Sequence, residues 1–182
     1  MDPQLVIQAQ HGDEGAFSQI AFAISGRLLA VAIRILRDRD QAEDATQQAL
    51  VTIWRDLPGL REVNRFDGWT YRVVVHACYA ELRRGRRETS ARLRLHAEES
   101  ADDPAVGIVD RDQMERGFQR LSPEHRAVLV LQHYLGLDID ATAELLGIPS
   151  GTVKSRTHSA RQALRGALEA DARLNAGMER SA

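Results

Sequence analysis

Apolar residues recur every three or four positions along most of this chain, and the alternation typical of a β-strand is absent. The three-to-four spacing places apolar side chains on one face of an α-helix. The pattern lapses over residues 88–111, which are acidic and contain Ser, Ala, Asp and a Pro. A stretch of that composition has little core of its own. We therefore expect an all-α fold with two small helical domains joined by a flexible acidic linker.

Breaks and caps in the pattern predict where the helices of the first half lie. The pair Pro58-Gly59 ends one helix, and Asp67 is the expected N-cap of the next. We expect one helix after Asp13, further helices over about residues 26–37, 40–57 and 68–86, and a loop over 59–67. The expected organisation is a first domain over 1–88, a linker over 89–111, a second domain over 112–175 and a tail over 176–182.

The second half has the signals of a helix-turn-helix. Ser122-Pro123-Glu124 has the chemistry of a helix start, and Gly136 interrupts the apolar helix that follows. Asp138 can cap a further helix over about residues 139–146, and Gly147 suits a left-handed C-cap. A last helix then begins near residue 150. Two helices joined by so short a turn match a helix-turn-helix, although such geometry also occurs in folds that bind no DNA.

The last helix divides its side chains between two faces. The inward face is expected to hold Val153, Thr157, Ala160 and Leu164. Residues 151–165 contain no acid, and the outward face holds cations and hydrogen-bond donors, namely Lys154, Ser155, His158, Ser159, Arg161, Gln162 and Arg165. This pattern favours insertion into the major groove of a DNA duplex. The alternative is a helical bundle with a solvated basic face.

The expected fourth helix carries a second basic face. Its members recur at helical spacing and are Arg72, His76, Tyr79, Arg83 and Arg87, with Arg84 alongside. Cations that follow a backbone and rings that stack on bases are what single-stranded nucleic acid requires. The preceding loop, with Asn64, Arg65 and Phe66, could form a pocket for an unstacked base. The alternative is that Phe66 and Trp69 belong to the core.

Charge is unevenly distributed although the formal net charge is only −2. Residues 83–94 hold six arginines and one acid, whereas residues 98–115 hold seven acids and a single arginine. Residues 151–165, which contain no acid, form a second basic block. Two basic blocks separated by an acidic segment indicate two contacts with a polyanion, joined by a segment that repels the polyanion.

Several functional classes are not expected. Cys78 is the only cysteine, so neither an intramolecular disulfide nor a multi-cysteine zinc site can form. The six histidines are scattered, and no phosphate loop, zinc-protease motif or nucleophile elbow is present. We therefore expect no enzyme, no metal and no cofactor. The first residues lack a secretory signal, and no continuous apolar run reaches the length of a membrane span, so we expect a cytoplasmic protein without membrane insertion.

The ordered set of motifs resembles the extracytoplasmic-function sigma factors of the sigma-70 family. In the first half the resemblance rests on Gly12-Asp13, Ala16-Phe17, Ala42-Glu43-Asp44 with Gln47 and Trp54, and Phe66 with residues 69–73. In the second half it rests on Leu121-Ser122-Pro123 with Arg126, Gly136-Leu137, residues 143–147 and the string Gly151-Thr152-Val153-Lys154-Ser155-Arg156. It implies a subunit that binds core RNA polymerase and promoter DNA, with an anti-sigma factor as a further partner. A stand-alone helix-turn-helix transcription regulator is the alternative.

The resemblance also implies roles for individual residues. The first domain would read and melt the −10 element with Asn64, Arg65, Phe66, Trp69, Arg72, His76, Tyr79, Arg83, Arg84 and Arg87. The second would bind the −35 element with Thr152, Lys154, Ser155, Arg156, His158, Ser159 and Arg161. Of these, Lys154, Ser155, His158 and Ser159 match base-reading positions, whereas Arg156 and Arg161 would serve phosphates or structure. Polymerase docking would fall to Asp44, Gln47, Gln48, Leu50 and Trp54, which by chemistry alone could equally be ordinary core and rim. His76, Ala80 and Ser159 depart from the common pattern, so no conventional promoter sequence is expected.

Overall fold

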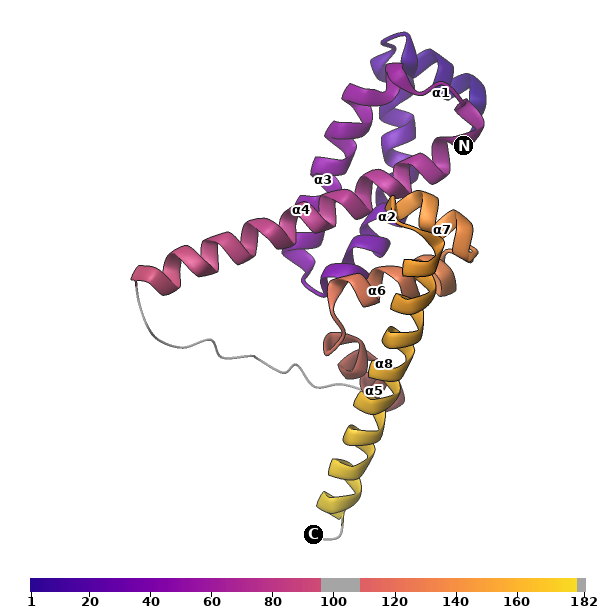
Figure 1. Cartoon of the computed structure of the whole chain (residues 1–182). Helices are drawn as coiled ribbons and strands as arrows, with labels where there is room; N and C mark the ends of the chain where they lie inside the picture. The colour runs from indigo at the N-terminus through magenta and orange to yellow at the C-terminus, as the bar shows by residue number, and fades with distance from the viewer. Residues whose placement is uncertain (96–108, 180–182) are drawn as a thin grey trace. The chain divides into compact units, whose positions relative to one another are not determined.

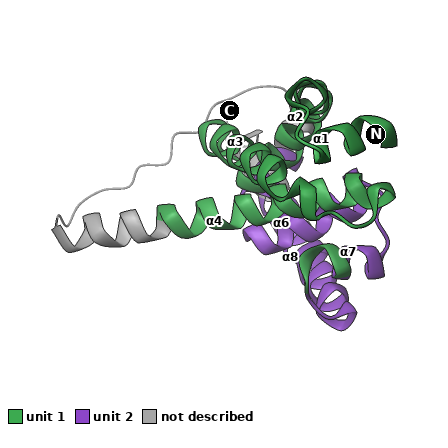
Figure 2. Cartoon of the chain, turned by 90° about the horizontal axis from the view of Figure 1, so that it is seen from above, with its two compact units in different colours: residues 1–91, 144–147 green, residues 92–143, 148–182 purple. Residues whose placement is uncertain are grey.

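The computed structural model describes the backbone of residues 1–95 and 109–179, and the side chains of residues 1–85 and 114–170. In these described ranges the secondary structure is helical and contains no strand, which confirms the all-α expectation. The chain divides into two compact units (Figure 2). Unit 1 comprises residues 1–91 and 144–147, and unit 2 comprises residues 92–143 and 148–182. The finer domain boundaries expected from the sequence stay a prediction.

The first part of the chain forms four α-helices and two short 3-10 turns (Figure 1). They are α1 (Pro3–Gln10), α2 (Glu14–Leu36), α3 (Arg39–Asp56), η1 (Leu57–Gly59), η2 (Val63–Arg65) and α4 (Phe66–Leu95). The expected separate helices after Asp13 and over 26–37 are one continuous helix, and α1 was not anticipated. Asp13 caps α2 by accepting the Ala16 amide at 2.9 Å, and Asp38 caps α3 by accepting the Gln41 amide at 2.9 Å.

The core of unit 1 is built on one face of α2. Its buried residues recur at helical spacing and are Ile20, Ile24, Leu28, Val31 and Ile35. They pack against α1 and α3. By length and composition α2 could cross a membrane, but this buried stripe is what the core helix of a folded unit requires.

Asp67 was expected to cap α4, and that expectation is wrong. Its carboxylate instead accepts hydrogen bonds from the N-terminal ammonium of Met1, at 3.1 Å, and from Arg27. Burial alone would raise the pKa of Asp67, but these two hydrogen bonds outweigh burial and the pKa lies below its ordinary value. Asp67 therefore ties the start of α4 to α1 and α2.

The second part of the chain contains four α-helices and one wide turn. They are α5 (Val109–Gln119), α6 (Pro123–Leu129), the π-helical turn η3 (Val130–Tyr134), α7 (Ile139–Leu146) and α8 (Ser150–Glu179). Ser122 accepts the His125 amide at 3.2 Å and Asp138 accepts the Ala141 amide at 2.7 Å, as the sequence predicts for N-caps. Gly147 has φ +66°, which confirms the left-handed cap between α7 and α8.

The last helix packs against both α5 and α6. Val153 and Ala160 on α8 are fully buried. At Gly117 on α5 the approach is close, because a Cβ built there would lie 2.9 Å from Leu164 Cδ1 and 3.3 Å from Leu168 Cδ2. The absence of a side chain at Gly117 therefore lets α5 lie against α8.

Candidate nucleic-acid interface

The two faces of α8 lie as the sequence predicts. Val153, Thr157 and Ala160 are buried and Leu164 is half-buried. The exposed residues of the opposite face are Lys154, Ser155, His158, Ser159, Arg161, Gln162 and Arg165. Thr152 and Arg156 are half-buried at its edge. A helix with one face fixed in a core presents the other as a rigid, cationic, hydrogen-bonding surface.

The entry into α8 is fixed by local contacts. The amide of Ile148 donates to the carbonyl of Ala143 at 3.1 Å, which closes the turn after α7. The hydroxyl of Ser150 donates to Asp140 Oδ1 at 2.7 Å, so the first turn of α8 is tied to the first turn of α7. Both bonds restrict the direction in which the outward face of α8 points.

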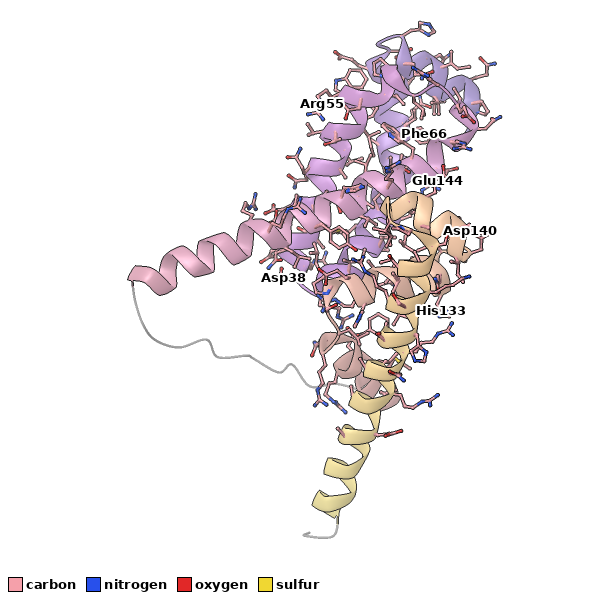
Figure 3. All side chains as sticks on the ribbon, in the orientation of Figure 1. Asp38, Arg55, Phe66, His133, Asp140 and Glu144 are labelled. Atoms are coloured by element: carbon pink, nitrogen blue, oxygen red, sulfur yellow. The ribbon has the colours of Figure 1, made fainter. Side chains whose placement is uncertain are left out.

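His133 is a neighbour of this face that sequence reasoning missed. His133, labelled in Figure 3, lies in the π-helical turn η3 and is exposed. Its Nε2 is 3.3 Å from Nη2 of Arg161 on α8. The sequence predicts an ordinary α-helix through this region, and no local signal indicates the wider turn.

The basic face of α4 is partly available to a ligand. Arg72, His76 and Arg83 are exposed and Tyr79 is half-buried, whereas the side chain of Arg87 lies outside the described residues. Burial lowers the pKa of His76, and the positive charges of Arg72 and Arg83 lower it further. His76 is therefore neutral at pH 7 and can both donate and accept a hydrogen bond.

Phe66 does not fit the role expected for it. Its side chain is only 1% exposed and packs in the core of unit 1, so its ring cannot stack on a base in this conformation. Trp69 is half-buried, with its ring centroid 6.1 Å from that of Phe66. The core interpretation of Phe66 is therefore the correct one, and we remove Phe66 from the nucleic-acid-contacting set.

A cavity of about 360 Å³ lies between α3 and α4. It is lined by Gln48, Thr52, Trp69, Arg72, Val73, His76, Ala77 and Ala80. The lining is mostly apolar and includes Arg72 and His76, a combination that suits a flat, partly polar group. The expected pocket residues Asn64 and Arg65 are exposed on the loop but do not line this cavity.

The outer face of α3 combines polar and apolar groups. Asp44, Gln47 and Gln48 are exposed, and Leu50 and Trp54 are half-buried. Trp54 packs on Phe17, with ring centroids 4.6 Å apart. Val51, which the sequence analysis did not single out, is 60% exposed one helical turn after Gln47. Val51 thus adds an exposed apolar group beside these amides.

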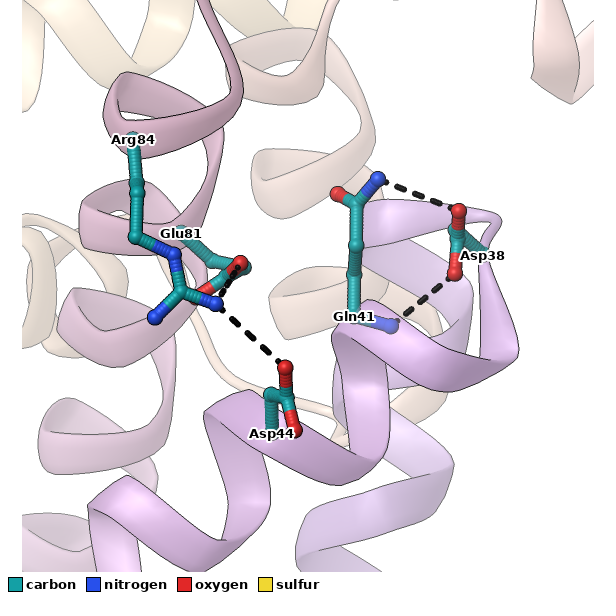
Figure 4. A network of polar contacts seen from close by, with 5 residues as sticks. All are labelled: Asp38, Gln41, Asp44, Glu81 and Arg84. Atoms are coloured by element: carbon teal, nitrogen blue, oxygen red, sulfur yellow. Dashed lines mark hydrogen bonds and ion pairs between the residues drawn. The ribbon is translucent and has the colours of Figure 1, made fainter. Parts of the chain in front are cut away.

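Arg84 on α4 is held by carboxylates (Figure 4). Its Nη2 lies 2.7 Å from Glu81 Oε1 on the same helix and 3.3 Å from Asp44 Oδ2 on α3. The network therefore connects the residue expected to bind polymerase, Asp44, with a residue expected to bind DNA.

Cys78 is fully buried, and burial raises the pKa of its thiol to about 12. The thiol therefore stays protonated at neutral pH and is shielded from reagents. Among the residues that the structure describes, no cluster of three or more His, Cys, Asp or Glu side chains is arranged to hold a metal ion.

Comparison with known proteins gives matches to both halves of the chain. Residues 23–88 match the family described as Sigma-70 region 2, and residues 111–164 match Sigma-70, region 4. The RNA polymerase sigma-H factor of Pseudomonas aeruginosa is 29% identical over 92% of this chain and 94% of its own length. The ECF RNA polymerase sigma factor SigM of Mycobacterium tuberculosis is 31% identical over 90% of this chain and 82% of its own length.

Solved structures with the same architecture include two sigma factors. The sigma factor RpoE, crystallised with the anti-sigma factor NepR from Bartonella quintana, has a TM-score of 0.67 and 26% identity over 85% of this chain and 98% of its own. CnrH, in complex with the cytosolic domain of CnrY, has a TM-score of 0.65 and 24% identity over 93% of this chain and 98% of its own. The second likeness concerns the fold alone.

Proposed function

The chain belongs to the extracytoplasmic-function sigma factors of the sigma-70 family and is an RNA polymerase sigma factor, and from this premise we propose how its residues divide promoter recognition. In this proposal α3 docks on core RNA polymerase, α4 handles the separated strand of the −10 element, and α8 reads the −35 element as a duplex. The observation that carries the proposal is the two-faced α8, with Val153 and Ala160 fully buried and Lys154 and His158 exposed.

Duplex recognition falls to the outward face of α8. Its first turns carry Lys154, Ser155, His158 and Ser159, whose donors and acceptors can meet base edges in the major groove. Arg161, about two turns after Lys154, is suited to phosphate. The lack of an acid in residues 151–165 supports this role, because a carboxylate here would repel the DNA backbone.

Strand separation falls to α4. Exposed Arg72 and Arg83 provide charge for a single-stranded backbone, and the cavity beside Trp69 and His76 suits an unstacked base. Binding of such a base shifts the promoter towards the open form, because a ligand favours the state that it contacts better. Asn64, Arg65 and Tyr79 stay in this proposed set, as does Arg87 outside the described side chains.

Polymerase docking falls to the outer face of α3. The acid and amides of Asp44, Gln47 and Gln48 form a polar rim, and Val51 and Trp54 provide apolar contact. This arrangement resembles the apolar centre and polar rim of a protein interface. The two units on one polymerase would then raise each other's effective concentration on the promoter.

Regulation and location follow from the family. The RpoE neighbour was solved with an anti-sigma factor, and we propose an anti-sigma factor as a partner of this chain as well. We also propose that the protein acts in the cytoplasm and has no catalytic chemistry of its own. A stand-alone transcription regulator is not favoured, because both sigma regions are matched.

Run-off transcription tests the proposal. Purified core RNA polymerase is combined with the chain and a library of promoters, and we expect a selected subset of templates to give transcripts. Arg39→Ala, which removes an exposed cation at the start of α3, serves as the control for non-specific charge effects. If addition of the chain produces no template selection, the proposed function is refuted. A gel shift that gives equal sequence-specific binding without polymerase would instead support the stand-alone regulator.

A further inference from the structure

Arg161 and His133 make an uncommon contact beside the DNA-reading face. Nη2 of Arg161 on α8 lies 3.3 Å from Nε2 of His133 in η3, and both side chains are exposed. Among the described side chains 114–170, no acid forms an ion pair with either residue. Two side chains that can both carry positive charge are therefore neighbours without a carboxylate between them.

The protonation of this pair is constrained by its geometry. The arginine guanidinium only donates hydrogen bonds, so within this contact the ring nitrogen of His133 is the acceptor. At 3.3 Å the contact is long for a hydrogen bond of this type. The pair is therefore a weakly held arrangement of two potential donors, and an anion placed between them would gain from both.

The π-helical turn is what brings His133 to this place. Leu135 donates its amide to the carbonyl of Val130, five residues earlier, at 3.1 Å, so the turn is one residue wider than an α-helical turn. Val130 and Leu131 are buried and anchor the turn, whereas His133 and Tyr134 are exposed. Such wide turns occur frequently at functional sites, and this one adds a second structural element to the face of α8.

We propose that His133 and Arg161 together bind one phosphate group of duplex DNA, next to the bases that α8 reads. This inference rests on the proposed function and adds His133 to it. A phosphate oxygen accepts from the Arg161 guanidinium, and His133 donates from Nε2 once its ring takes the tautomer that carries the hydrogen on that nitrogen. The direct contact between Arg161 and His133 is then replaced by two hydrogen bonds, one from each side chain to the same phosphate group.

The position along α8 favours a phosphate over a base edge. Arg161 lies seven residues after Lys154, which at 1.5 Å per residue is about 10 Å along the helix axis. In helix-turn-helix proteins the first residues of the recognition helix reach the bases, while flanking elements contact the backbone. His133, from outside α8, is such a flanking element.

The test measures binding of holoenzyme, reconstituted from core RNA polymerase and the full chain, to a fluorescein-labelled duplex by anisotropy. His133→Ala is expected to weaken binding about threefold to tenfold, by the same factor on a −35 duplex and on a scrambled duplex, because phosphate contacts carry no base information. His133→Glu should weaken binding further, since the new carboxylate would pair with Arg161. His133→Lys should retain affinity, which a purely structural role for the imidazole would not allow.

His125→Ala is the matched control, because it removes a histidine from the same half of the chain at the start of α6. Its affinity should equal that of the wild-type chain. Circular dichroism melts of every variant establish that unit 2 is folded. Wild-type affinity in folded His133→Ala would overturn the inference, as would a loss confined to one base sequence or a failure of His133→Lys to retain binding. If the wild-type chain does not select promoters in run-off transcription, the proposed function is refuted. If it does select promoters but His133→Ala binds as the wild-type chain does, only the phosphate-binding inference is refuted.

Discussion

Arg83 and Arg84 are adjacent in sequence but differ in their electrostatic surroundings, and this difference predicts unequal effects of neutralising them. Arg83 is exposed and has no acidic partner among side chains 1–85. Arg84 lies 2.7 Å from Glu81 and 3.3 Å from Asp44, so its charge is already balanced within unit 1. We expect Arg83→Gln to impair single-strand binding clearly and Arg84→Gln to impair it little.

The magnitude follows from counterion release. A phosphate neutralised on a single strand contributes about 0.7 to the slope of log K against log salt concentration. Arg83→Gln should therefore reduce the steepness of that slope by about 0.7. Arg84→Gln should change it far less, because DNA would have to compete with two carboxylates. Since Arg84 and Asp44 are each 58% exposed, their ion pair contributes less than about 1 kcal/mol to folding, and neither variant should unfold.

The assay is a salt titration. Holoenzyme containing each variant is mixed with a fluorescent single strand from the −10 region of a selected promoter, and affinity is measured over a series of NaCl concentrations. Glu81→Gln is the complementary variant, because it removes the nearer carboxylate partner of Arg84. Arg84 is then freer to bind a phosphate, so the slope of log K against log salt concentration should become steeper. Open-complex yields on the duplex promoter should follow the same order.

Two results would refute this reasoning. Equal slope changes in Arg83→Gln and Arg84→Gln would mean that Glu81 and Asp44 do not compensate Arg84. An unchanged slope and unchanged open-complex yields in the double variant would remove the basic face of α4 from strand binding altogether.

Three further predictions concern single residues. Lys154→Ala should cost about 1–3 kcal/mol of discrimination on the −35 duplex while core polymerase is still retained in a pull-down, and equal loss of both contradicts the division of roles. Phe66→Ala should lower the free energy of unfolding of unit 1 by about 3–5 kcal/mol in urea titrations, because the ring is buried, and a loss near zero contradicts this. Cys78 should resist thiol reagents in the native state. Folding raises the pKa of the Cys78 thiol from 9.0 to about 12, so as pH rises the unfolded chain loses the thiol proton at a lower pH than the folded chain does. The free energy of unfolding of the wild-type chain, relative to that of Cys78→Ala, should therefore fall between pH 9 and 12.

Local chemistry made much of the fold predictable. The caps formed by Asp13, Asp38, Ser122 and Asp138 each depend on a side chain and an amide three residues later, so their sequence signals are self-contained. Gly147 was predictable for the same reason. The two faces of α8 could be predicted from helical spacing alone, because its apolar residues recur on the buried face and its cationic and polar residues on the exposed face.

What depends on partners distant in sequence was not predictable. Asp67 has the chemistry of a cap, but Arg27 and the N-terminal ammonium compete for its carboxylate, and only the folded unit brings them together. Phe66 was expected in a loop over residues 59–67, but it is the first residue of α4, and its burial depends on how that helix packs. The π-helical turn that presents His133 has no sequence signature. It depends on the amide of Leu135 bonding to the carbonyl of Val130, and backbone groups are the same for every such residue.

The contact between α5 and α8 at Gly117 has a consequence for the cost of ordering α8 when DNA binds. Because α8 is supported by α5 and α6 over a long stretch, it is already ordered before any duplex is present. Association then loses little conformational entropy, and discrimination between promoters reflects the fit of exposed side chains. A larger residue at position 117 would loosen this support, and weaker binding would follow from a helix that has to be ordered by the DNA itself.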